Sequence, residues 1–220
     1  MSEEHIVKSY DEELQILNNS IVQMGSLTES LLIDSMDAII KVDKEAVSKI
    51  VKKDEEINKF RSSIDQQIMT ILVKRSPVAI DLRYAISALK ISQDLERIGD
   101  LAKGNAKKIL PLPDDLPPEI LNGMRRLGEV VQKQLKKSLD SFIEKSVSKS
   151  LEVIKNDGQV NDLATVSIKE ALVFLSKDKK NLDFATNLLF VNKNLERAGD
   201  HISRICQNIY YLIEGDYPKK

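Results

Sequence analysis

Several residue types are scarce in this chain, and each scarcity excludes a class of protein. There is one cysteine, Cys206, among 220 residues, so an internal disulfide and a thiolate metal site are both excluded. The chain has no tryptophan, 8 glycines and 6 prolines, and it is rich in Leu, Ile, Lys and Glu. So few helix-breaking residues among so many helix formers favour long helices, and we expect an all-α protein.

An excess of charge of either sign is also missing. Lys and Arg number 33 against 34 Asp and Glu, which leaves a formal net charge of -1 and no general attraction to nucleic acid or anionic lipid. No apolar run approaches the roughly 18 residues that a membrane span requires. The acidic segment 1–5 is unlike a secretory signal. We therefore expect a cytoplasmic protein with no nucleic-acid partner and no membrane insertion.

Two catalytic signatures are absent from the sequence as well. Di-metal oxidases built in helix bundles use Glu-x-x-His pairs, and neither His5 nor His201 follows a glutamate at that spacing. No Gly-rich nucleotide loop of the Walker type occurs. An enzyme is thereby disfavoured, which leaves a function in protein contacts or a purely structural coiled-coil scaffold.

What the chain does contain is one short string written twice. Residues 94–100 read DLERIGD and residues 194–200 read NLERAGD. Each copy places a Glu and an Asp on one helix face because they stand four residues apart, as Glu96 with Asp100 and Glu196 with Asp200. Exposed like charges at this spacing repel by a few tenths of a kcal/mol, so their repetition reflects either chemistry or a gene duplication.

The repeated string belongs to a longer internal repeat. Apolar positions spaced by threes and fours predict a first helix that ends near Val42 and a second that begins at Asp43 as N-cap. Ser76 is expected to cap a third helix, with Pro77 in its first turn, that runs to about Leu110.

The pattern then resumes after a connector with four prolines, residues 111–118. We predict a tandem repeat of two three-helix bundles, residues 1–110 and 119–220, with six long helices in all. Gly158 lies inside the expected fifth helix and is the position most able to kink it. Cys206 falls on an apolar stripe and is expected in the core, whereas His201 points about 100° away from Asp200 and is expected at the surface.

The paired carboxylates continue an apolar stripe instead of lying on the most polar face of their helices. Asp54 and Asp157, on the second helix of each half, do the same. Three carboxylates in each half could therefore converge on a metal ion, which oxygen ligands suit. The alternative places Glu96 and Asp100 at a rim, paired with Arg97 or a neighbouring lysine. Spacing alone leaves both interpretations open.

Longer strings give the chain a family resemblance. Pro77 with Asp81-Leu82-Arg83-Tyr84, and the run Ala88–Ser92 ahead of the first motif, are similar to the PhoU family, the phosphate-specific transport system accessory proteins of bacteria. In the second half, the motif with His201 and the run Tyr210–Leu212 before Gly215 resemble the closing helix of that family. The likeness covers essentially the whole chain.

The resemblance implies two three-helix bundles in a protein that is commonly a homodimer and has no catalytic activity. It implies a regulator of phosphate uptake and a negative regulator of the phosphate-starvation response, which couples the phosphate ABC transporter to a sensor histidine kinase. The implied partners are the transporter's ATPase subunit and the kinase, at the cytoplasmic face of the membrane. Some members bind iron or zinc clusters through the acidic motif. The match assigns Glu96 and Asp100 to one metal site and Glu196 and Asp200 to the other, while Asp54 and Asp157 are added from helix geometry alone.

Overall fold

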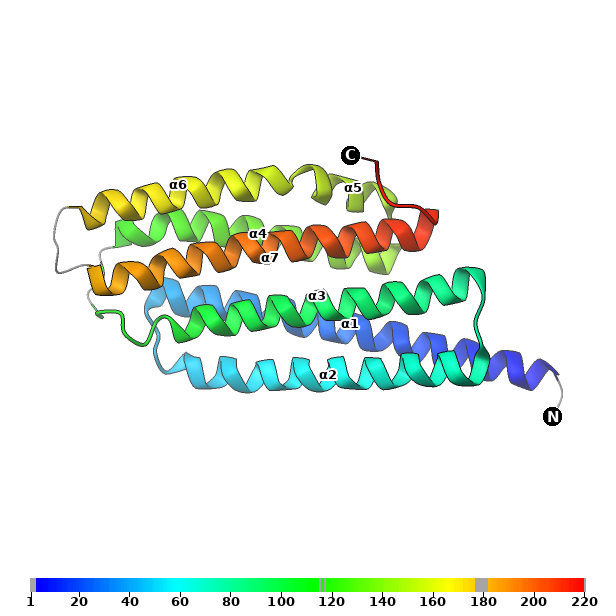
Figure 1. Cartoon of the computed structure of the whole chain (residues 1–220). Helices are drawn as coiled ribbons and strands as arrows, with labels where there is room; N and C mark the ends of the chain where they lie inside the picture. Colours follow the sequence, from blue (N-terminus) through cyan, green and yellow to red (C-terminus); the bar gives the residue numbers. More distant parts are fainter. Residues whose placement is uncertain (1–2, 115, 117, 177–181, 220) are drawn as a thin grey trace.

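The molecule is an elongated bundle of helices that all run along one axis (Figure 1). The computed structural model describes the backbone of residues 3–114, 116, 118–176 and 182–219. Within these residues the helices are α1 (Glu3–Lys41), α2 (Ala46–Arg75), α3 (Ala79–Lys107), α4 (Pro118–Glu144), α5 (Val147–Lys155), α6 (Asp157–Leu175) and α7 (Leu182–Glu214). The prediction of an all-α protein built from two bundles is confirmed. None of the helices described is long and apolar enough to cross a lipid bilayer.

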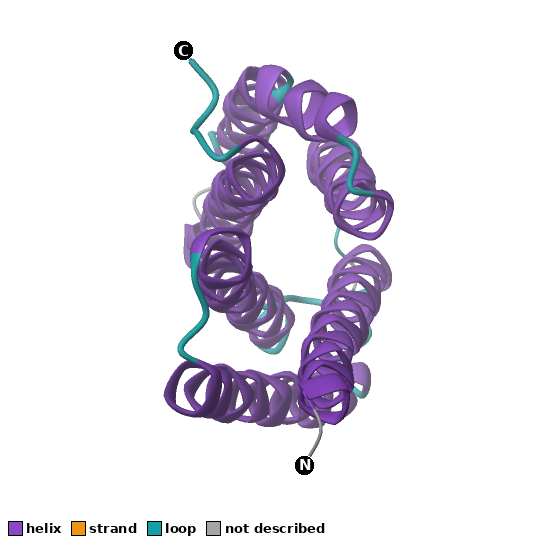
Figure 2. Cartoon of the chain, turned by 90° about the vertical axis from the view of Figure 1, so that its right-hand side faces the viewer, coloured by secondary structure: helices purple, strands orange, loops and turns teal. Residues whose placement is uncertain are grey.

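The two halves pack side by side through equivalent helices. In the first half α1, α2 and α3 contact one another, and in the second half α4 and α7 pack with the pair α5 and α6. Between the halves α3 lies against α7 and α1 lies against α4, so these two helices of the first half each pack on their counterpart in the repeat (Figures 1 and 2). Buried side chains of both halves belong to one apolar core cluster. The second bundle therefore shares its apolar core with the first.

The turn between α1 and α2 follows the sequence closely. α1 ends at Lys41, and Val42 takes a left-handed conformation with φ 51°. The carboxylate of Asp43 then accepts hydrogen bonds from the backbone N–H groups of Glu45 and Ala46, both at 3.1 Å. Asp43 thus accepts the hydrogen bonds that its sequence position predicts, because these N–H groups have no partner inside the helix. The helix itself begins later than predicted, at Ala46, with Glu45 in the N-cap position.

The predicted start of the third helix was wrong. Ser76 does not cap α3; it ends α2 in the left-handed conformation, and its N–H donates to the carbonyl of Leu72. Pro77 lies outside both helices, Val78 is extended, and α3 begins two residues later than expected, at Ala79. A serine followed by a proline is compatible with the start of a helix and with the end of one. Here Ser76 and Pro77 follow the end of α2.

The expected fifth helix is divided in two. Ser146 is the N-cap of α5, since its hydroxyl accepts a hydrogen bond from the N–H of Lys149, and α5 ends at Lys155. Asn156 interrupts the helix before α6 starts, and Gly158 lies in the first turn of α6 with open space around it. The break predicted at Gly158 therefore occurs at Asn156, two residues before the glycine.

In the connector, Leu112 and Leu116 are buried in the core, while residues 115 and 117 lie outside the described part of the chain.

Candidate functional site

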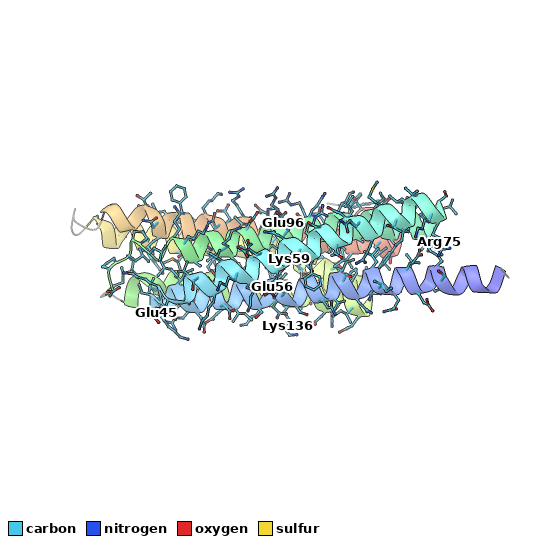
Figure 3. The ribbon with its side chains drawn as sticks, turned by 90° about the horizontal axis from the view of Figure 1, so that it is seen from below. Glu45, Glu56, Lys59, Arg75, Glu96 and Lys136 are labelled. Atoms are coloured by element: carbon cyan, nitrogen blue, oxygen red, sulfur yellow. The ribbon has the colours of Figure 1, made fainter. Side chains whose placement is uncertain are left out.

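The two acidic motifs lie on the two helices that join the halves. α3 and α7 run antiparallel along each other through the middle of the molecule (Figure 1). Two polar contacts fix their register: Asn194 donates to Asn105 at 2.8 Å, and His201 Nδ1 lies 2.7 Å from Asp94 Oδ1. Figure 3 shows Glu96 about midway along the length of the molecule.

A glycine in each motif lets the neighbouring helix come close. A Cβ atom at Gly99 would lie 3.1 Å from Ile57 Cδ1 on α2, and one at Gly199 would lie 2.9 Å from Val160 Cγ1 on α6. Both glycines are buried. Gly99 also faces Asp54, whose Oδ1 would lie 3.5 Å from the added Cβ. The close approach at the glycine therefore brings Asp54 of α2 to the acidic face of α3.

In the first half two of the three predicted carboxylates meet, and a lysine lies between them. Lys103 Nζ donates to Asp54 Oδ2 at 2.6 Å and to Asp100 Oδ1 at 2.7 Å. The Asp54 residue is only 2% exposed, and its second oxygen, Oδ1, has no hydrogen-bond partner. Burial alone would lower the pKa of Lys103, but the hydrogen bonds that it donates to Asp100 and Asp54 outweigh burial and raise that pKa. The lysine is thus held as a cation against a buried carboxylate.

Glu96 lies apart from Lys103 and its two carboxylate partners. Its carboxylate is 3.8 Å from Arg97 Nε, and it faces Arg61, whose pKa is lowered by burial and partly restored by the charge of Glu96. Asp100 also accepts a hydrogen bond from Arg97 at 3.3 Å. These are the pairings with Arg97 and a nearby lysine that the rim interpretation predicts, although the partner lysine, Lys103, also reaches the buried Asp54.

In the second half the corresponding carboxylates have no such lysine between them. Ser203 stands where the repeat places Lys103, and its side chain is buried. Burial, and then the negative charge of Asp200, raise the pKa of Asp157. Glu196 is bound by Lys193 at 2.7 Å, one turn before it. No lysine or arginine pairs with Asp157 or Asp200 within the residues that the structure describes.

The donor chemistry of the two halves can therefore be compared directly. Among the described residues, no three carboxylate, imidazole or thiolate groups are assembled as a metal site. The second half offers two carboxylates, Asp157 and Asp200, whose mutual repulsion a cation would relieve. The residues of that half fit a hard or borderline metal ion in charge and donor type. In the first half the ammonium of Lys103 already supplies one positive charge to Asp54 and Asp100.

Sequence reasoning missed the contact between Asp94 and His201. The prediction that His201 lies at the surface was wrong, because its side chain is 12% exposed and pairs with Asp94 across the two halves. Arg204 Nε lies 3.8 Å from the same carboxylate. The one available signal was that the repeat replaces Asp94 with Asn194.

A cleft of about 350 Å³ adjoins this ion cluster where α2, α3 and α7 meet. It is lined by Arg61, Gln93, Asp94, Glu96, Arg97, His201 and Arg204. Cys206, in contrast, is a core residue as predicted, and burial raises the pKa of its thiol to about 12.

Comparison with known proteins agrees with this geometry. The PhoU domain model matches residues 21–109 and again residues 124–209, one match for each half of the repeat. This chain is a member of the PhoU family. Among curated relatives, the phosphate-specific transport system accessory protein PhoU homolog of Rhizobium meliloti is 33% identical over 220 residues, covering 100% of this chain and 93% of that protein. The homolog from Caulobacter vibrioides is 36% identical over 97% of this chain and 93% of its own length.

Solved PhoU structures share the fold. The crystal structure of PhoU from Pseudomonas aeruginosa matches with a TM-score of 0.90 at 30% identity, over 94% of this chain and 100% of that one. The phosphate transport system regulatory protein PhoU from Streptococcus pneumoniae matches with a TM-score of 0.87 at 29% identity, over 96% and 100% of the two chains. The family likeness thus holds for both bundles and for the way they pack.

Proposed function

We propose that this chain regulates phosphate uptake without catalysing a reaction, and that it holds the phosphate-starvation response off while phosphate is plentiful. It does so by coupling a phosphate ABC transporter to a sensor histidine kinase. The observation that carries the proposal is the extent of the similarity: both repeats match the PhoU family, and relatives named as accessory proteins of phosphate-specific transport align over the full chain.

The architecture supports a role in protein contacts. The molecule presents long helical faces along its whole length (Figure 3), and a net charge of -1 gives it no general affinity for nucleic acid. The proposed partners are the ATPase subunit of the transporter and the histidine kinase, both met at the inner face of the membrane from the cytoplasm. A homodimer is the proposed assembly.

The acidic motifs are proposed to bind metal, with iron or zinc as the ions. The second half has the residues that fit: Glu196, Asp200 and Asp157 would hold the ion, and the ion would neutralise carboxylates that repel one another. Glu96, Asp100 and Asp54 form the corresponding set in the first half, where Lys103 already supplies a positive charge.

A gene deletion tests the regulatory role. In a deletion strain grown with abundant phosphate, a reporter driven by a phosphate-starvation promoter should become constitutively active, and a plasmid copy of the full chain should silence it again. The same full chain, immobilised, should retain the purified ATPase subunit or the cytoplasmic part of the kinase. If the deletion strain keeps the reporter silent in rich phosphate, the regulatory assignment is wrong.

A further inference from the structure

Lys103 lies where a metal ion bound to the first acidic motif would have to lie. Its ammonium nitrogen is 2.6 Å from Asp54 and 2.7 Å from Asp100, and metal–carboxylate bonds are roughly 2.0–2.6 Å long. A cation ligated by these two oxygens would occupy the same space as the ammonium group. We infer that Lys103 is the resident cation of the first motif and excludes divalent metal from it, so that metal binding is confined to the second motif.

The burial of Asp54 explains why a cation is needed there at all. This residue is 2% exposed, and an unpaired buried carboxylate is strongly disfavoured. Lys103 itself is only partly buried, with 22% of its side chain exposed, so its amino group reaches inward from the edge of the bundle. Asn58 adds a longer hydrogen bond at 3.4 Å to the oxygen that Lys103 binds.

One oxygen of Asp54 remains free for a ligand. Oδ1 is buried and has no hydrogen-bond partner, and it lies toward Gly99 of α3. Removal of the ammonium group would therefore leave both oxygens of Asp54, together with Asp100, available to another cation. The first motif keeps carboxylate ligands that Lys103 blocks.

The second half supplies the contrast within the same molecule. Ser203 stands at the position of Lys103 and carries no charge. Lys193 binds Glu196 of the second motif from the exposed side, where 57% of the lysine side chain is open to solvent. An exposed lysine of this kind is displaced at little cost, whereas Lys103 is held by two carboxylates. For the second half, the inference rests on the proposed metal-binding role of the motif. For the first half it does not, since the exclusion of metal by Lys103 follows from the contacts of that lysine.

The test is a Zn²⁺ titration of the full chain against a chelating indicator, with the bound metal counted after dialysis. Lys103→Met keeps the aliphatic part of the side chain and removes the charge, and Lys107→Met on the exposed side of α3 is the matched control. We expect Lys103→Met to bind one more Zn²⁺ per chain than wild type, with at least tenfold higher affinity at that site. Adding Asp54→Asn and Asp100→Asn should abolish the gain, and Lys107→Met should behave as wild type. Equal Zn²⁺ binding by Lys103→Met and wild type overturns the inference.

A second arm leaves Lys103 in place and so does not depend on the folding of that variant. Asp100→Asn in the wild-type background should change Zn²⁺ affinity less than twofold, because the first motif is already blocked. A loss of more than tenfold would overturn the inference. Glu196→Gln with Asp200→Asn tests the other proposal: if this variant and wild type bind Zn²⁺ equally, the proposed metal site of the second half fails, while the gain in Lys103→Met still decides the role of Lys103.

Discussion

In the first half of the molecule the buried Asp54 and the partly exposed Asp100 share Lys103. In the second half burial and the charge of Asp200 raise the pKa of Asp157, and Ser203 stands at the position of Lys103. The surrounding helices occupy equivalent places in the repeat. In each half the motif glycine packs against the neighbouring helix, Gly99 of α3 against α2 and Gly199 of α7 against α6. The exchange of lysine for serine at this position thus leaves the carboxylates of the second half without the cation that links those of the first half. The fold was duplicated, but the electrostatics of the two copies differ.

The largest expected effect comes from breaking the ion network of the first half. Lys103→Met should lower the free energy of unfolding by about 3 kcal/mol, because it leaves the buried Asp54 without its counter-ion. Urea unfolding in the presence of a chelator measures this change. Asp54→Asn added to Lys103→Met should recover part of the loss, since the unpaired charge is gone, and Lys107→Met should stay within about 0.5 kcal/mol of wild type. A loss below about 0.5 kcal/mol in Lys103→Met would show that the network contributes little.

The sequence predicted the repeat and the helices because both depend on local pattern. Apolar spacing gives the helices, and the apolar face gives Cys206 and Asp54 their buried positions. The link between Asp54 and Lys103 was not predictable, because it joins residues 49 apart and depends on how α2 packs at Gly99. The pairing of Asp94 with His201 spans 107 residues and depends on the register of α3 against α7. Lys103 lies three residues beyond Asp100 in the sequence, but the rim interpretation named only an unspecified neighbouring lysine.

The glycines of the two motifs should also respond differently to alanine. At Gly199 the new methyl group would lie 2.9 Å from Val160, whose branched side chain has little freedom in a helix, so Gly199→Ala should destabilise by about 1–2 kcal/mol. At Gly99 the nearest atom is the flexible end of Ile57 at 3.1 Å, and the gain in helix propensity, about 1 kcal/mol, should offset the crowding. Thermal unfolding of both variants checks the order. An equal loss in the two would mean that the two helix contacts are equally tight.

A charge added to the second half should have a smaller effect. Ser203→Lys places an ammonium group where the first half has Lys103, so it should stabilise the metal-free protein by at most about 1 kcal/mol, because Asp200 is exposed. Chemical unfolding in chelator measures the gain, with Ser203→Met as the uncharged control of similar length. If Ser203→Lys is no more stable than Ser203→Met, the carboxylates of the second half do not repel one another appreciably.

The smallest expected effect is on the pH dependence of stability. Burial and the charge of Asp200 raise the pKa of Asp157 in the folded state, so the folded state binds more protons there than the unfolded state. Its contribution to stability therefore falls as pH rises from its unfolded pKa, about 3.9, through the raised folded value. Asp157→Asn should gain stability relative to wild type across that interval, by less than about 1 kcal/mol. Unfolding curves at a series of pH values in chelator measure the difference, and a difference that does not vary with pH would contradict the raised pKa.

The asymmetry of the two motifs is tested most directly by exchanging their distinguishing residues. In wild type, the rise in melting temperature on adding Zn²⁺ should be abolished by Asp200→Asn and preserved in Asp100→Asn. In the reciprocal variant that carries Lys103→Ser and Ser203→Lys, the dependence should reverse, so that Asp100→Asn abolishes the rise and Asp200→Asn preserves it. If Asp200→Asn abolishes the rise in both backgrounds, or Asp100→Asn abolishes it in wild type, then Lys103 does not decide which half of the molecule takes the metal.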